Sequence, residues 1–286
     1  MKYALAVALS LVTVVSAQAA SPEEAYLAAR DAAIAKLNPP GDRGPLTDAE
    51  IKQEALARET LGKQMRTVIG PVNVKGFSGE GTYNVGSLFN GDIETGTLDG
   101  LLFTRNKDVR LVVTTTGLAE RWIKSPDGLA ADKDEVPKDL KSALTLELFY
   151  TRSSSFDAAV SRMGELPVTA PAGASFAYAM LSTRRQDIGV APAAEMLVGV
   201  IAPPRVYVVS APIAPIKVMP ACEKLAKDAD AKANRMQRGT SDDAEAVRQK
   251  GDADMLKCFA ERVKTMPVFA QLTKRAQDIA DGLVAK

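Results

Sequence analysis

Apolar and small residues recur at intervals of three and four between positions 219 and 263, which predicts two helices folded back on each other. Nearly all other positions in this stretch are charged, polar or alanine. Gly239 suits the residue just past one helix, and Thr240 or Ser241 suits the cap of the next. In an antiparallel pair closing there, the facing residues are Cys222–Cys258, Leu225–Met255, Ala229–Gly251, Ala233–Val247 and Met236–Ala244. The pattern therefore predicts a C-terminal helical hairpin.

Two helices near the N-terminal end of the sequence and one after the hairpin are also predicted. Ser21 with Glu24 and Thr47 with Glu50 form capping boxes, in which side chain and backbone satisfy each other at a helix start. The expected helices are 22–37 and 48–69. After Pro267 an amphipathic stripe runs to the end of the chain, for which the hairpin is the nearest packing partner. Its residues are Phe269, Leu272, Ala276, Ile279 and Leu283.

The part between these helices is divided by glycine and proline into short elements. We expect strands at 101–105, 109–115, 144–151, 176–183 and 205–211, and helices at 118–124 and 154–163. The apolar segment 193–202 fits a helix or a strand. The predicted fold class is therefore α+β, with N-terminal helices, a middle domain of short antiparallel strands, and a C-terminal hairpin plus a terminal helix. The corresponding boundaries are 1–19, 20–70, 71–218 and 219–286.

The first 19 residues have the pattern of a secretory signal peptide. Lys2 supplies the positive start, Ala4–Val15 the apolar core, and Ala17-Gln18-Ala19 the small-residue cleavage site. The apolar run is short for a membrane span, so we expect cleavage, with no transmembrane anchor left afterwards. An uncleaved anchor is the alternative. The simplest destination is the periplasm, with release from the cell as the other possibility.

Export changes the interpretation of the two cysteines. An even number of cysteines in an exported chain is typical of a disulfide, and the hairpin places Cys222 opposite Cys258. Two free, buried cysteines are the alternative. A disulfide at the open end of the hairpin predicts a structural clamp.

Composition and charge exclude several classes of function. The chain is 46% hydrophobic and 25% charged, as folded proteins usually are, and its 36 basic and 35 acidic residues are interleaved. This pattern does not favour a nucleic-acid partner. There is no histidine, which excludes Ser-His and Cys-His nucleophilic pairs and the usual zinc sites. The Ser-x-x-Lys and Gly-x-Ser-x-Gly motifs are also absent, so we expect no cofactor and can assign no catalytic residue.

The remaining candidate chemistry is that of carboxylates. Asp92, Glu94 and Asp99 lie in a glycine-rich segment, where they could act as acid and base in glycoside cleavage or bind calcium. Acidic residues beside glycine also commonly form turns.

These observations favour an exported, non-enzymatic protein of the cell envelope that acts in binding or assembly, with an envelope protein as the expected partner. One alternative is a carboxylate-dependent hydrolase acting on a polysaccharide, which requires two carboxylates about 5–9 Å apart in a cleft. A small-ligand carrier is the third possibility and requires an apolar pocket in the middle domain.

Overall fold

The computed structural model describes most of the chain after the predicted signal peptide. The described residues are 20–38, 45–85, 88, 98–106, 108–124, 139–147, 160–184, 193–214, 219–236 and 241–284. The predicted signal at 1–19 and the predicted turn at 237–240 lie outside them.

The fold is α+β, as the sequence predicts. The helices are α1 (Pro22–Leu37), α2 (Asp48–Ile69), α3 (Thr116–Lys124), α4 (Leu140–Glu147), α5 (Pro220–Met236), α6 (Ser241–Val263) and α7 (Pro267–Val284). The strands are β1 (Thr82–Asn84), β2 (Gly100–Arg105), β3 (Val109–Thr115), β4 (Val160–Leu166), β5 (Phe176–Arg184), β6 (Ala193–Ala202) and β7 (Arg205–Ile213). Both predicted capping boxes are present, at the starts of α1 and α2.

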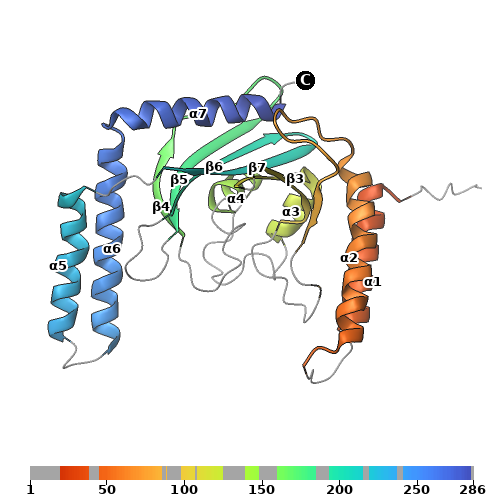
Figure 1. The fold of residues 1–286 in the computed structure, drawn as a ribbon, viewed down its shortest axis with the longest axis horizontal. Coiled ribbons are helices and arrows are strands. Elements are labelled where there is room, and N and C mark those ends of the chain that lie inside the picture. Colours follow the sequence, from red (N-terminus) through yellow and green to blue (C-terminus); the bar gives the residue numbers. More distant parts are fainter. Residues whose placement is uncertain are drawn as a thin grey trace, which may run out of the picture.

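The seven strands of the described residues form one antiparallel sheet in the order β1-β2-β3-β7-β6-β5-β4 (Figure 1). Two meanders, β1 to β3 and β4 to β7, meet where β3 pairs with β7. After β3 the chain passes through α3 and α4, crosses to the far edge at β4, and returns strand by strand. The single sheet therefore joins the N-terminal and C-terminal parts of the chain.

Helices cover both faces of the sheet. On β7, Tyr207 and Val209 belong to the core beneath α7, whereas Val206 and Val208 belong to the core beneath α3 and α4. Because side chains alternate between the faces of a strand, a strand covered on both sides is apolar throughout. β6 is covered on both sides in the same way. Its sequence therefore does not alternate between polar and apolar residues, which is why it also fits a helix.

Gly199 on β6 makes room for α4. A Cβ atom placed on Gly199 would lie 2.8–2.9 Å from three carbon atoms of the Leu144 side chain. The leucine can therefore approach the sheet backbone only because glycine has no side chain.

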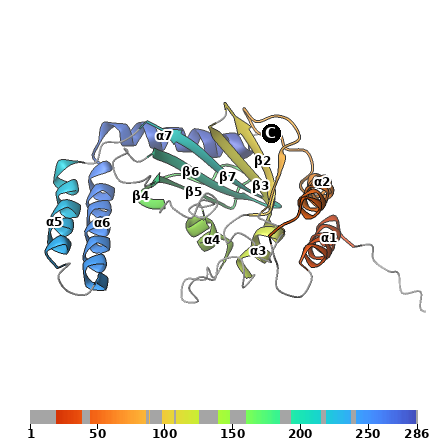
Figure 2. The same cartoon turned by 60° about the horizontal axis from the view of Figure 1, so that its bottom comes forward.

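Helical pairs lie beside both ends of the sheet. The N-terminal arm (α1 and α2) packs at the β1 end, where Gly62 of α2 lies against Tyr83. The C-terminal arm (α5 and α6) packs at the β4 end, where Gly164 lies against Ala260 and Val263. Both arms extend past α3 and α4, away from α7 (Figure 1), with different tilts (Figure 2).

Two predictions in the middle domain were wrong. A strand was expected at 144–151, but residues 144–147 form the end of α4. Residues 148–151 lie outside the described part of the chain. Asp139 starts this helix by accepting a hydrogen bond from the backbone of Ser142 at 2.7 Å, and Leu140 and Leu144, four apart, pack on the sheet. The helix expected at 154–163 is wrong over its last residues, because Val160 and the residues after it belong to β4 and pair with β5. Residues 154–159 lie outside the described part of the chain. Pairing with the next strand along the chain therefore makes residues from Val160 a strand.

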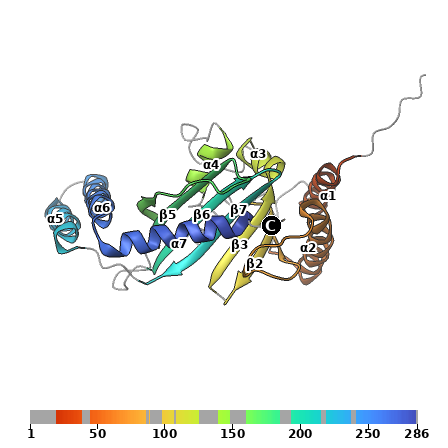
Figure 3. The ribbon, with the colours of Figure 1, turned by 90° about the horizontal axis from the view of Figure 1, so that it is seen from above.

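The terminal helix exists where predicted, but its expected partner was wrong. The buried stripe of α7 packs on the sheet, and the helix crosses β5, β6 and β7 (Figure 3). Only three residues, 264–266, separate α6 from α7, and the chain turns sharply there (Figure 1). Consequently α7 leaves the C-terminal arm instead of folding along it.

The C-terminal hairpin is present, and two of its predicted facing pairs are confirmed. Cys222 and Cys258 form a disulfide with their Cα atoms 5.5 Å apart. Midway along the arm, a Cβ atom placed on Gly251 would overlap the Cβ atom of Ala229. The two helices are therefore in backbone contact at the predicted position.

Replacing Gly251 with alanine is expected to open the C-terminal arm, because two Cβ atoms cannot occupy the same space. We expect a loss of about 1–3 kcal/mol, typical of overpacking, measured as faster amide hydrogen exchange in α5 and α6. The double variant Ala229→Gly/Gly251→Ala moves the methyl group to the other helix and should recover most of the protection. Equal exchange in the single and double variants would contradict this packing.

Candidate functional site

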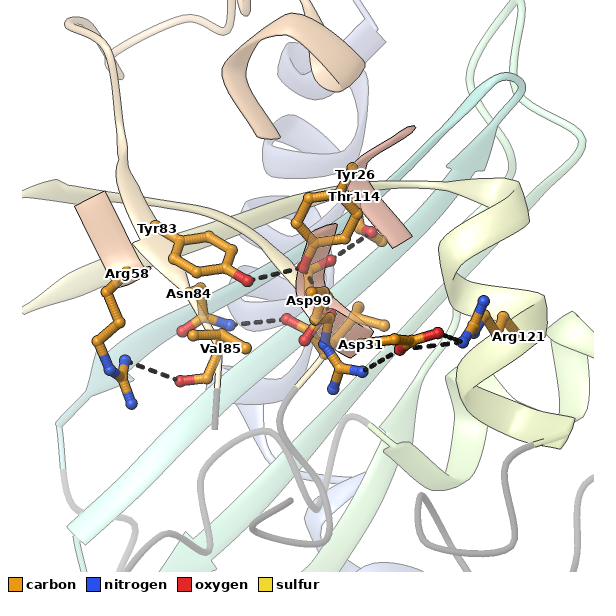
Figure 4. A network of polar contacts seen from close by, with 11 residues as sticks. Tyr26, Asp31, Arg58, Tyr83, Asn84, Val85, Asp99, Thr114 and Arg121 are labelled. Carbon is orange, nitrogen blue, oxygen red and sulfur yellow. Dashed lines mark hydrogen bonds and ion pairs between the residues drawn. The ribbon is translucent and has the colours of Figure 1, made fainter. Parts of the chain in front are cut away.

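Asp99 is the one predicted carboxylate that the structure describes, and it is buried at the junction of the N-terminal arm and the sheet (Figure 4). Its side chain is 15% exposed, and the Nε atom of Arg30 lies 2.9 Å from its Oδ2 atom. The hydroxyl of Tyr26 donates a hydrogen bond to the same oxygen at 2.8 Å. Asp92 and Glu94 lie outside the described residues.

Neighbouring elements complete this network. The Tyr83 hydroxyl lies 2.7 Å from that of Tyr26. Because the Tyr26 proton is directed at Asp99, Tyr83 is the donor in this pair. The Thr114 hydroxyl donates to the backbone oxygen of Asp99. The five residues of this "tyrosine–aspartate network", Tyr26, Arg30, Tyr83, Asp99 and Thr114, come from α1, β1, the residue before β2, and β3.

Burial governs the protonation of the network. It raises the pKa of Asp99, although Arg30 and Tyr26 favour the charged carboxylate and oppose the rise. It also raises the pKa of Tyr26 and Tyr83, and the negative charge of Asp99 adds to both shifts. Both tyrosines therefore keep their protons and serve as hydrogen-bond donors.

The exposed side of α1 extends these contacts. Asp31 lies 3.2 Å from Arg121 of α3 and 3.9 Å from Arg30. One turn before Tyr26, Glu23 accepts a hydrogen bond from Thr115 at 2.7 Å, and Thr115 in turn accepts from the backbone of Leu118 in the first turn of α3. Polar contacts from one face of α1 therefore attach the N-terminal arm to the sheet and to α3.

This arrangement favours a structural role for Asp99. Its Oδ2 atom is occupied by a cation and a hydroxyl donor, and the surrounding groups are fixed by burial. A glycosidase site instead needs a second carboxylate across an open cleft. Among the described residues, no group of three or more acidic or cysteine side chains could hold a metal ion.

Two hollows lie beside α7. One, of about 420 Å³, is formed where β4 and β5 meet the start of α7. It is lined in part by Glu165, Tyr178, Lys264 and Phe269, and the Tyr178 hydroxyl donates to Glu165 at 3.1 Å. The other, of about 280 Å³, lies between the second half of α7 and strands β3 and β7. Sequence patterns gave no sign of either, because each combines residues from distant segments.

No family model, curated protein or solved structure matches this chain. None of the helices in the described part of the chain is both long enough and apolar enough to cross a membrane.

Proposed function

We propose that this protein is an exported, non-enzymatic component of the cell envelope that binds a protein partner with its two helical arms. The observation that supports this proposal is the placement of the arms at opposite ends of one sheet, both extending past α3 and α4 (Figure 1). Two surfaces held at a set separation suit the recognition of one large partner.

Both arms are rigidly held. The tyrosine–aspartate network fixes α1, and α2 packs on the first three strands. In the other arm the disulfide joins α5 to α6, and Gly251 lies against Ala229. Preorganised binding surfaces lose less conformational entropy when a partner docks, which favours a binding role.

Each arm also exposes large apolar side chains among its charges. On α2, Ile51 is 50% exposed and Leu56 is 65% exposed, and on α5 Leu225 is 40% exposed. On α5 the charged residues form exposed pairs one turn apart, such as Lys224 with Asp228 at 2.7 Å. Such mixed surfaces are common in protein–protein interfaces.

Two features support export to the envelope. Residues 1–19 have the three-part pattern of a signal peptide. The Cys222–Cys258 disulfide is of the kind that persists in oxidising compartments such as the periplasm.

Site-specific photocrosslinking in living cells tests the proposal. A photoreactive amino acid is introduced into the full chain at Ile51 on the N-terminal arm, at Lys232 on the C-terminal arm, and at Lys274 on α7 as a matched exposed control. We expect adducts of the same mass from both arms and none from α7. Absence of adducts from the arms, or equal adducts from Lys274, would contradict the proposal.

A further inference from the structure

We propose that the hollow between α7 and strands β3 and β7 binds a small amphipathic anion, with the anionic head at its cationic rim and the apolar body on its floor. The floor is formed by Val109, Val209 and Ala211 of the strands, and Ile279 and Leu283 of α7 form the apolar wall. At about 280 Å³ the hollow is slightly smaller than typical ligand pockets, which measure about 300–1,000 Å³, so it suits a small ligand.

The charges around the hollow favour an anion. Lys75, Arg105 and Arg275 line it, and within the described part of the chain none of the three forms an ion pair. The carboxylate in the lining, Asp278, is neutralised by Lys274, whose Nζ atom lies 2.7 Å from Oδ2 and 3.0 Å from Oδ1. Three cations beside a compensated carboxylate leave a net positive rim.

Arg105 is held in place by the neighbouring turn. Gly76 has a φ of 83°, and a Cβ atom there would overlap the Nη1 atom of Arg105. The guanidinium carbon lies 5.6 Å from the centre of the Phe77 ring, which gives a cation–π contact. The turn itself is closed by a backbone hydrogen bond from Phe77 to Val74 at 2.9 Å. A guanidinium positioned in this way presents its donors at the rim and suits a carboxylate or phosphate head.

Gly282 keeps one side of the hollow open. On this helical residue, the nearest atom to an added Cβ would be Lys75 Cβ at 3.9 Å. A larger side chain at this position can therefore enter the hollow without a clash at its base. The site lies on the α7 face of the sheet, away from the side toward which the arms extend (Figure 1), so ligand binding there is separable from partner binding.

Calorimetric titration with octanoate and octyl phosphate tests the inference, with 1-octanol as the uncharged probe. We expect a dissociation constant below about 1 mM for at least one of the two anions, an affinity that ligands of this size can reach. Octanol should bind at least tenfold more weakly. Arg105→Gln and Arg275→Gln should each weaken anion binding at least tenfold. Arg110→Gln is the matched control, because this exposed arginine on β3 does not line the hollow.

Gly282→Phe fills the hollow without removing a charge and should abolish binding of both anions. Its thermal midpoint, compared with that of the unmodified protein, shows whether the variant remains folded. Preference for one anion identifies the head group as carboxylate or phosphate. The inference is overturned if neither anion binds, if octanol binds as tightly as the anions, or if Arg110→Gln weakens binding as much as Arg105→Gln.

Discussion

Replacing Arg30 with methionine is expected to lower the free energy of unfolding by about 3–5 kcal/mol, because it leaves the buried Asp99 carboxylate without its cation. The two side chains are 11% and 15% exposed, and the Arg30 Nε and Asp99 Oδ2 atoms lie 2.9 Å apart. Methionine retains most of the apolar volume of the arginine stem, so the loss reports mainly on the charge. Urea unfolding of the chain without residues 1–19, followed by circular dichroism, measures it.

Two variants serve as controls for this prediction. Asp31→Asn removes the exposed carboxylate that also faces Arg30 and should cost less than about 1 kcal/mol. The double variant Arg30→Met/Asp99→Asn removes both buried charges and should recover much of the lost stability. If Arg30→Met were as mild as Asp31→Asn, the network would not be an anchor of α1.

The same variant should respond to pH. Burial holds the pKa of Asp99 above its ordinary value, so the folded chain binds the proton more readily than the unfolded chain. The stability contributed in this way is complete below the unfolded pKa and is lost as the pH rises through the folded pKa. Without Arg30 the folded pKa rises further. Arg30→Met should therefore regain stability between about pH 7 and about pH 4, whereas Arg30→Met/Asp99→Asn should not.

Loss of the disulfide is the second large effect that we expect. Cys222 and Cys258 are 36 residues apart, and the loop-entropy relation predicts about 4 kcal/mol for a loop of this size. Because α5 packs mainly on α6, the loss should be concentrated in the C-terminal arm. In Cys222→Ser/Cys258→Ser, amide hydrogen exchange should accelerate strongly in α5 and little in β6. Uniform acceleration across the sheet would instead show that the disulfide stabilises the whole fold.

Features specified by neighbouring residues could be predicted from the sequence. The capping boxes at Ser21 and Thr47 locate the starts of two helices, because cap and partner are three residues apart. The seam of the C-terminal arm could be predicted because a hairpin pairs each residue with one at a calculable position, which gives Ala229 opposite Gly251. In both cases the relevant contact follows from a short-range rule.

Features that depend on distant segments could not be predicted in this way. The pattern of Leu140 and Leu144 specifies a helix only once the sheet is present to pack against. Asp99 lies far from Arg30 in the chain. A tyrosine and an arginine one turn apart on α1, beside the apolar residues that pack on the core, were the available signal that this helix docks partly through polar groups.

The position of α6 and α7 after the strands in the chain has a consequence for the order in which the sheet is covered. Until α6 and α7 have been synthesised, β4 lacks the helix that packs beside it, and the part of the sheet that α7 covers is exposed. An open strand edge and an uncovered apolar face are the usual starting points of aggregation. A nascent or truncated chain that ends before Ser241 would present both, so protection from aggregation requires α6 and α7 to be in place.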